Sequence, residues 1–204
     1  MKKKITLEKI VNLLIYRANC TARFFFFKMF PYKKLNLSNF LRSISNLEYL
    51  VIKTEVPYMP KTFPKEYPAG MDLDIITTPK DFNQLINKTL EFAKKSPHFK
   101  LKILRNNKNI LICFMFLGHM HYQIDITSSI DLLGKEFIKS SISERKSFKG
   151  TYIPSEKHEL IYRIYELNKG KTKKHHKDYI LSHIKNLDLK LIKSNELKEF
   201  IKQI

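Results

Sequence analysis

The amino-acid sequence predicts an α+β fold, with a small mixed β-sheet flanked by helices and a helical segment at the C-terminal end. Three extended apolar stretches follow one another between residues 99 and 127, and residues 106–108 have the composition of a hairpin turn. Stretches with apolar residues at helical spacing precede and follow these strands. Consecutive strands with helices grouped outside them are typical of the α+β class.

The first half of the chain is expected to place helices on both sides of two strands. Apolar residues at helical spacing predict helices over 6–18, 37–47 and 81–96. Apolar and β-branched residues predict strands over 47–54 and 72–78. Four prolines between residues 56 and 70 predict a loop, because proline cannot donate a hydrogen bond to a sheet.

The second half is expected to contain three strands and then helices. The predicted strands are 99–105, 109–116 and 121–127. The predicted helices are 154–168, 173–186 and 194–203, whereas residues 131–150 are polar and show no clear period. The organisation that follows is an N-terminal helical segment (1–33), a sheet-containing domain (34–150) and a C-terminal helical region (151–204).

The charge balance limits the partners of the protein. The chain of 204 residues carries 38 basic and 19 acidic residues, a formal net charge of +19. Such an excess favours nucleic acid, nucleotides or an anionic membrane surface as partners. An A/T-rich coding bias is the alternative explanation, because lysine, asparagine and isoleucine are all frequent and arginine is rare among the basic residues.

The cysteines and the N-terminal residues indicate a cytoplasmic protein. Cys20 and Cys113 are too few for a disulfide scaffold or a zinc site, which favours a reducing compartment. Polar residues interrupt the apolar stretch near the N-terminus, and no small-residue cleavage site follows it. The aromatic run at 24–27 is far too short to span a bilayer, so we expect a soluble protein without a membrane partner.

Two aspartates open the predicted strand 72–78. Asp72 and Asp74 are separated by one residue, so in a strand they face the same side, about 7 Å apart at their bases. Two charges at that distance repel by roughly 2–3 kcal/mol at an effective dielectric of about 20, and a bound Mg²⁺ (or Mn²⁺) removes this cost. The alternative is structural, with Asp72 capping a turn after Gly70 and Asp74 on a solvated face.

A third aspartate, Asp125, lies in the predicted strand 121–127. If that strand lies beside 72–78, three carboxylates converge, which is typical of metal-dependent phosphoryl or nucleotidyl transfer. His119 and His121 precede Asp125, and His121 shares its face by strand parity. These histidines are candidates for metal ligation or proton transfer, with a polar surface position as the alternative.

The aspartate pattern resembles the nucleotidyltransferase fold, and more narrowly the uncharacterised nucleotidyltransferase family. The segments that carry the resemblance are LVIKT (50–54), GMDLDIIT (70–77), PKDF (79–82) and IPSEKHELIY (153–162). The resemblance implies that residues 34–150 form the catalytic domain. It also implies that Asp72 and Asp74 hold the metals and that Asp125 completes the triad and helps activate the acceptor hydroxyl.

The resemblance also implies nucleotide-binding positions. Lys53 and Thr54 stand where the family has Lys-Gly, Gly70 precedes the aspartates, and Lys65 is the nearest basic residue upstream of them. Further along the chain, Lys171, Lys173 and Lys174 are candidates for phosphate or acceptor contacts, with a solvated loop and helix start as the alternative, and His121 is a further candidate for such a contact.

The sequence therefore predicts a magnesium-dependent enzyme that transfers a nucleoside monophosphate from an NTP, such as ATP, to a hydroxyl acceptor. RNA, a small molecule and a protein side chain remain open as acceptors. Two other functions also remain open: a non-catalytic basic nucleic-acid-binding protein, and an inactive nucleotidyltransferase-like protein.

Overall fold

The computed structural model shows an α+β fold, as the sequence predicts. It describes residues 34–55, 59–95, 99–106, 108–116, 119–170 and 173–203. The helix predicted over 6–18, the whole N-terminal segment 1–33 and Cys20 lie outside the described residues.

A five-stranded mixed sheet with the strand order β2-β4-β7-β6-β5 is the centre of the fold. Its strands are β2 (Tyr49–Val51), β4 (Asp72–Thr77), β5 (Lys100–Arg105), β6 (Asn109–Phe116) and β7 (His119–Thr127). Strands β4 and β7 are parallel, and the other neighbours are antiparallel. Two small antiparallel pairs accompany this sheet: β1 (Lys34–Leu35) with β3 (Tyr67–Pro68), and β8 (Lys146–Phe148) with β9 (Thr151–Ile153).

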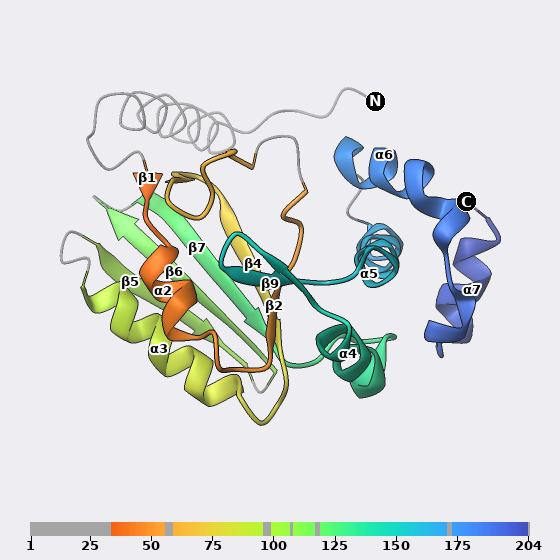
Figure 1. Ribbon diagram of the computed structural model, residues 1–204, viewed down its shortest axis with the longest axis horizontal. Helices are drawn as coiled ribbons and strands as arrows, with labels where there is room; N and C mark the ends of the chain where they lie inside the picture. Colours follow the sequence, from red (N-terminus) through yellow and green to blue (C-terminus); the bar gives the residue numbers. More distant parts are fainter. Residues whose placement is uncertain are drawn as a thin grey trace, which may run out of the picture.

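The helices form two groups around the sheet (Figure 1). The first group, α2 (Ser38–Ser43) and α3 (Phe82–Lys94), packs on one face of the sheet. The second group is α4 (Gly134–Ser143), α5 (Glu156–Asn168), α6 (Lys174–His183) and α7 (Asn195–Ile201), with 3₁₀ turns at Ile184–Asn186 and Leu189–Leu191. These helices gather on the side of β2 and β4. Within the described part of the chain, no helix has the length and apolar character that crossing a bilayer requires.

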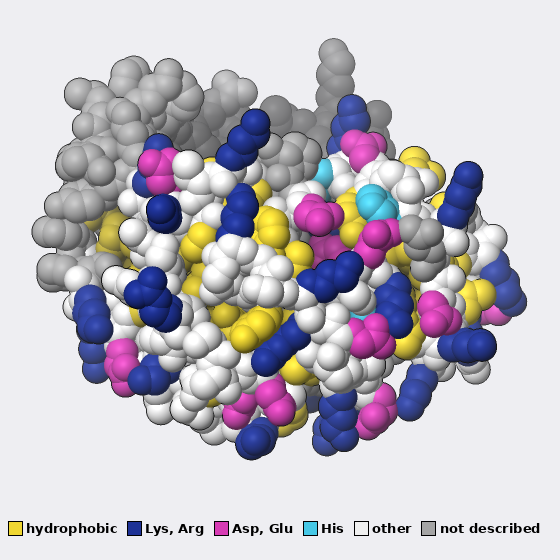
Figure 2. Space-filling model, viewed as in Figure 1, with side chains coloured by type: hydrophobic (Ala, Val, Ile, Leu, Met, Phe, Trp, Pro, Cys, Tyr) yellow, Lys and Arg dark blue, Asp and Glu magenta, His cyan; other side chains and the backbone are white. Residues whose placement is uncertain are grey.

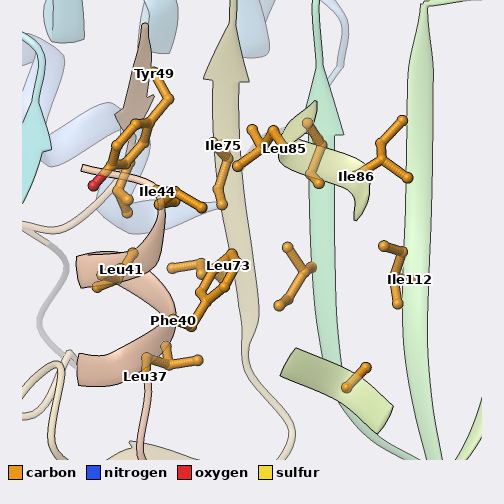
Figure 3. Packing of buried hydrophobic residues seen from close by; sticks show 14 of the residues in the cluster. Leu37, Phe40, Leu41, Ile44, Tyr49, Leu73, Ile75, Leu85, Ile86 and Ile112 are labelled. Carbon is orange, nitrogen blue, oxygen red and sulfur yellow. The ribbon is translucent and has the colours of Figure 1, made fainter. Parts of the chain in front are cut away.

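Alternation along the strands directs apolar residues into the core beneath α2 and α3. Leu73 and Ile75 of β4 point to this side, where they meet Leu41 of α2 and Leu85 of α3 (Figure 3). Strand residues two apart share a face, so the residues between them point to the opposite side of the sheet. This parity fixes which side of β4 receives its two aspartates.

A second core lies between the sheet and the C-terminal helices. It contains Leu50 of β2, Ile76 of β4, and Leu160 and Ile164 of α5, all at most 2 % exposed. The C-terminal helices therefore pack on the face of the sheet that also carries Asp72 and Asp74. The predicted domain boundary at residue 150 falls in the turn of the β8–β9 hairpin.

Most predicted elements are present with small shifts of their ends. The strand predicted over 109–116 has the same bounds as β6, and the strand predicted over 47–54 is shorter as β2. Helix α4 lies in the stretch 131–150, where the sequence showed no period.

Candidate functional site

The parallel pairing of β4 with β7 brings the aspartates to one face of the sheet. Asp74 is the Cα partner of Asp125, and Asp72 is the partner of Gln123 two positions earlier. Paired residues on neighbouring parallel strands point to the same side, and residues two apart on one strand do too. The neighbouring arrangement on which the predicted triad depends is therefore present.

The three aspartates differ in their exposure. Asp72 is exposed at the start of β4, Asp125 is half-buried, and the Asp74 side chain is 14 % exposed. Burial raises the pKa of Asp74, because it disfavours the charged form, while the Lys53 ammonium lowers that pKa in part. Asp72 is therefore in contact with solvent, whereas Asp74 lies in a partly dehydrated environment.

Lys53 forms an ion pair with one of these carboxylates. Its Nζ lies 2.8 Å from Asp74 Oδ2 and 3.2 Å from Glu166 Oε2. Its backbone N–H donates to Glu159 Oε1 over 3.2 Å. Burial alone would lower the pKa of Lys53, but Asp74 and Glu166 outweigh it and raise the pKa above its ordinary value. Lys53 is therefore held as a cation between strand β4 and helix α5.

The backbone of Lys53 is left-handed, with φ of 59°. This conformation is uncommon for a residue with a side chain, and it costs of order 1 kcal/mol or more unless surrounding contacts enforce it. The bond from its N–H to Glu159 is such a contact. The strain coincides with the residue that links Asp74 to the C-terminal helices.

Helix α5 contributes a buried charged face that the sequence reasoning missed. Glu159, Arg163 and Glu166 lie at i, i+4 and i+7, which places them on one side of the helix. Arg163 is fully buried, its Nε donates to Glu159 Oε1 over 2.8 Å, and its guanidinium lies 4.6 Å from the centre of the Tyr179 ring. The detectable signal was a set of charged residues with the spacing of a buried helical face.

The balance of charge at the site is negative. The contiguous network of Lys53, Arg163, Asp74, Glu159 and Glu166 contains one more carboxylate than cations, and Asp72 and Asp125 add two further carboxylates on the sheet. Oxygen donors with an excess of negative charge are the set that Mg²⁺ or Mn²⁺ prefers, so the donor chemistry fits such an ion. Among the described residues, however, no three His, Cys, Asp or Glu side chains are already arranged as a metal site.

The predicted nucleotide-binding residues lie in different environments. Only Lys53 contacts one of the aspartates. Thr54 is buried and lines a cavity of about 90 Å³ whose walls also include Glu55 and Glu156. Gly70 has φ of 89°, and its N–H donates to the carbonyl of His121. Lys65 is exposed in the turn before β3.

His121 lies in an aromatic cluster at the far end of β7. Its side chain is 4 % exposed, and its ring contacts those of Phe99, Phe116 and Tyr122. A register shift between Phe114 and Met115 interrupts the alternation of the β6–β7 ladder at this end. Four strand residues separate His121 from Asp125, roughly 13 Å, so His121 is not beside the carboxylates.

A lysine-rich segment of the sequence, residues 169–177, overlaps the start of α6. Lys173 and Lys174 are exposed at the start of this helix, and Lys171 lies outside the described residues, as does the side chain of His119. His176 of the same segment is 2 % exposed, and its ring centre lies 4.4 Å from that of His175. Burial and, after it, the charge of Arg163 lower the pKa of His176 to about 4.

Comparisons with known proteins bring no family or relative to this chain. No protein-family model matches the sequence, and no curated protein matches it. The function of this chain is therefore inferred from its own residues and their geometry.

Proposed function

We propose that this protein is a metal-dependent nucleotidyltransferase that transfers a nucleoside monophosphate from an NTP to a hydroxyl group of an acceptor. The observation that carries the proposal is the register of β4 and β7, which pairs Asp74 with Asp125 and keeps Asp72 on the same face. The resemblance of residues 50–54, 70–77 and 79–82 to the nucleotidyltransferase fold points to the same chemistry.

The three aspartates have two roles in the proposed reaction, metal binding and proton transfer. Asp72, Asp74 and Asp125 hold Mg²⁺ or Mn²⁺, which supplies Lewis-acid stabilisation of the NTP phosphates when it is bound. Asp125 also accepts the proton of the acceptor hydroxyl. The hydroxyl oxygen then bonds to the α-phosphorus, and the bond from that phosphorus to pyrophosphate breaks.

Lys53 keeps Asp74 in place for this task. The ammonium fixes Oδ2 of Asp74 at 2.8 Å, while Glu166 and Glu159 of α5 fix the side chain and the backbone of Lys53. A carboxylate held in one orientation loses less conformational freedom when it binds a ligand. Lys53 is therefore proposed as a positioning residue, and not as a direct phosphate contact.

The alternative of a non-catalytic nucleic-acid-binding protein finds less support. In Figure 2 the Lys and Arg side chains are spread over the visible face and alternate with Asp and Glu side chains. A binding surface for a polyanion is expected to concentrate its cations along one track. The net charge of +19 is the observation that keeps this alternative in the test below.

Calorimetry of NTP binding with and without Mg²⁺ tests the proposal. The wild type should bind at least one of the four NTPs, and only when Mg²⁺ is present. The double variant Asp72→Asn, Asp74→Asn should bind that NTP at least about tenfold more weakly, a loss of about 1.4 kcal/mol. Asp178→Asn, which removes an exposed carboxylate of α6, is the matched control and should bind like the wild type.

The contradicting outcome is equally specific. Circular dichroism must first show that each variant keeps its fold. If the folded wild type binds no NTP but binds RNA with a steep salt dependence, and the double variant binds RNA equally well, the alternative is correct. If NTP binding is unchanged in the double variant, the aspartates are not the site.

A further inference from the structure

A pocket opens beside Asp125 on the side away from Lys53. Asp125 of β7 is the Cα partner of Leu111 on β6, and Leu111 is the partner of Leu104 on β5. These residues share the face that carries the three aspartates, since paired strand residues point to the same side. The pocket has a volume of about 290 Å³, and its other lining residues are Arg105, Asn106 and Asn109.

Two asparagine side chains line this pocket, and one of them offers a donor. Oδ1 of Asn106 accepts from the backbone N–H groups of Lys108 and Asn109, and Oδ1 of Asn109 accepts from Thr127 Oγ1 over 2.6 Å. The two backbone donors fix which end of the Asn106 amide is oxygen, whereas the Thr127 hydroxyl also donates to the carbonyl of Ser129 and so does not fix the orientation of the Asn109 amide. Within the described part of the chain, Nδ2 of Asn106 has no hydrogen-bond partner, so it remains as a donor for a ligand.

We propose that this pocket binds the acceptor, and that the acceptor is a small neutral polyhydroxylated molecule such as a sugar or polyol. The proposal rests on the function proposed above and names the class of its acceptor. A hydroxyl group both donates and accepts, so it suits a carboxylate that accepts, Asp125, next to an amide that donates, Asn106. Leu104 and Leu111 provide apolar walls for the carbon skeleton.

The size of the pocket favours a small acceptor. Binding pockets for drug-sized ligands span about 300–1,000 Å³, and the volume of this pocket, about 290 Å³, lies just below that range.

Its lining disfavours a nucleic-acid strand. Among the residues that the structure describes, no lysine and no aromatic residue lines the pocket, whereas single-stranded nucleic acid is bound by cationic tracks and aromatic stacking platforms. Arg105, which does line it, donates to Asn83 of α3.

The reaction that follows is balanced with the NTP as the second substrate. One hydroxyl of the acceptor gives its proton to Asp125, and its oxygen forms a bond with the α-phosphorus. The bond between that phosphorus and the bridging oxygen of pyrophosphate breaks, and pyrophosphate carries away the electron pair. The products are the nucleotidylated acceptor and pyrophosphate.

Neighbouring positions on the exposed strand β5 give a matched pair of variants. Leu104 is 52 % exposed on the pocket side, and Ile103 is 45 % exposed on the opposite face. Leu104→Trp adds bulk to the pocket, and Ile103→Trp adds the same bulk outside it. Because both positions are half-exposed on an edge strand, both variants are expected to fold, and circular dichroism checks this.

The test is saturation-transfer NMR with a mixture of glucose, N-acetylglucosamine, myo-inositol and sorbitol, recorded without nucleotide. The wild type and Ile103→Trp should bind at least one of them, and Leu104→Trp should bind it about tenfold more weakly. Pyrophosphate release from Mg²⁺–NTP should then depend on that compound in the wild type and fall by a similar factor in Leu104→Trp. NTP binding itself should be equal in all three proteins.

Two results overturn the proposal. The first is that none of the four compounds binds the wild type. The second is that Leu104→Trp binds as well as Ile103→Trp does. Failure of the wild type to bind any NTP is a different outcome. It removes the proposed transferase function and, with it, the acceptor role of the pocket. Because the NMR experiment contains no nucleotide, it separates this outcome from failure of the pocket to bind a polyol. A short RNA that binds in place of the polyols would replace the acceptor class named here.

Discussion

Lys53 combines a strained backbone with a side chain that forms two ion pairs. Its left-handed backbone, with φ of 59°, is the conformation that favours glycine, yet its ammonium is needed between Asp74 and Glu166. Glycine would relieve the strain and leave two carboxylates without their cation. Strained backbone of this kind is concentrated at functional sites, and here it occurs beside the proposed metal ligand Asp74.

His176 gives the fold a pH dependence that can be measured. Its pKa is about 4 in the folded chain, because of burial and then Arg163, against about 6.5 when unfolded. Between these values the unfolded state binds more protons, so the free energy of unfolding falls as pH drops from about 6.5 towards 4. Urea unfolding at about pH 7 and about pH 5 should show a smaller loss of stability for His176→Gln than for the wild type.

His183, the last residue of α6, supplies the control for this prediction. His183→Gln makes the same substitution at a half-buried position of the same helix, so it is the matched control. An equal loss of stability in His176→Gln and the wild type would show that another group controls the response to acid.

Single residues could be predicted where strand alternation sufficed. Asp72, Asp74 and Asp125 were predicted to share a face, and the register of β4 and β7 places them so. The partners of Lys53 could not be predicted, because Asp74 is 21 residues away and Glu159 is 106 residues away along the chain. Such contacts depend on the packing of α5 against the sheet, which no local pattern encodes.

At the scale of elements, α5 combines an apolar face with a buried ionic face. Replacing Arg163 with Met should lower the free energy of unfolding by about 3–5 kcal/mol, because it leaves the Glu159 carboxylate buried without its partner. Urea unfolding followed by circular dichroism measures this loss. The double variant Arg163→Met, Glu159→Gln should recover part of it, because it removes the buried charge.

An exposed ion pair at the C-terminal end of α7 provides the control for that result. Lys202 lies 2.6 Å from Glu199, and both side chains are at least 65 % exposed. Lys202→Met should therefore change the free energy of unfolding by no more than about 1 kcal/mol. If Arg163→Met were as mild as Lys202→Met, the buried pair would not be important for the stability of α5.

Helix α4 shows why some elements could not be predicted from the sequence. Its residues include Ser140, Ser141 and Ser143, and serine is a weak helix former because its hydroxyl competes for backbone groups. In the helix all three hydroxyls donate to carbonyls three or four residues earlier. Packing of Phe137 and Ile138 in the second core stabilises a helix that local propensity does not favour.

At the scale of the whole molecule, β4 joins the two cores. Leu73 faces the core under α2 and α3, and Ile76 faces the core under the C-terminal helices. We therefore expect one unfolding transition in calorimetry. Leu41→Ala in one core and Leu160→Ala in the other should each cost about 2–5 kcal/mol and shift the same transition, because both side chains are fully buried.

Leu181→Ala is the control, because this leucine is 67 % exposed and its loss should cost no more than about 0.5 kcal/mol. Two separate transitions, one sensitive to Leu160→Ala only, would instead mean that residues 151–204 form an independent unit. That outcome would match the division at residue 150 predicted from the sequence.

The α+β class could be predicted because it depends only on the order of elements, and the structure confirms it. The strand order could not be derived from the order of elements, because β4 pairs with β7 across a connection that contains α3, β5 and β6. Only the chemistry of the aspartates suggested that pairing in advance.

The position of β5 at the end of the strand order has a consequence for the behaviour of the protein in concentrated solution. Within the described residues its outer edge pairs with no strand, and Ile103 and Leu104 on it are exposed, which is a pattern that promotes intermolecular sheet growth. Lys100, Lys102 and Arg105 lie on the same strand. Two copies that approach edge to edge bring these cations together, so their repulsion opposes aggregation, most strongly at low salt.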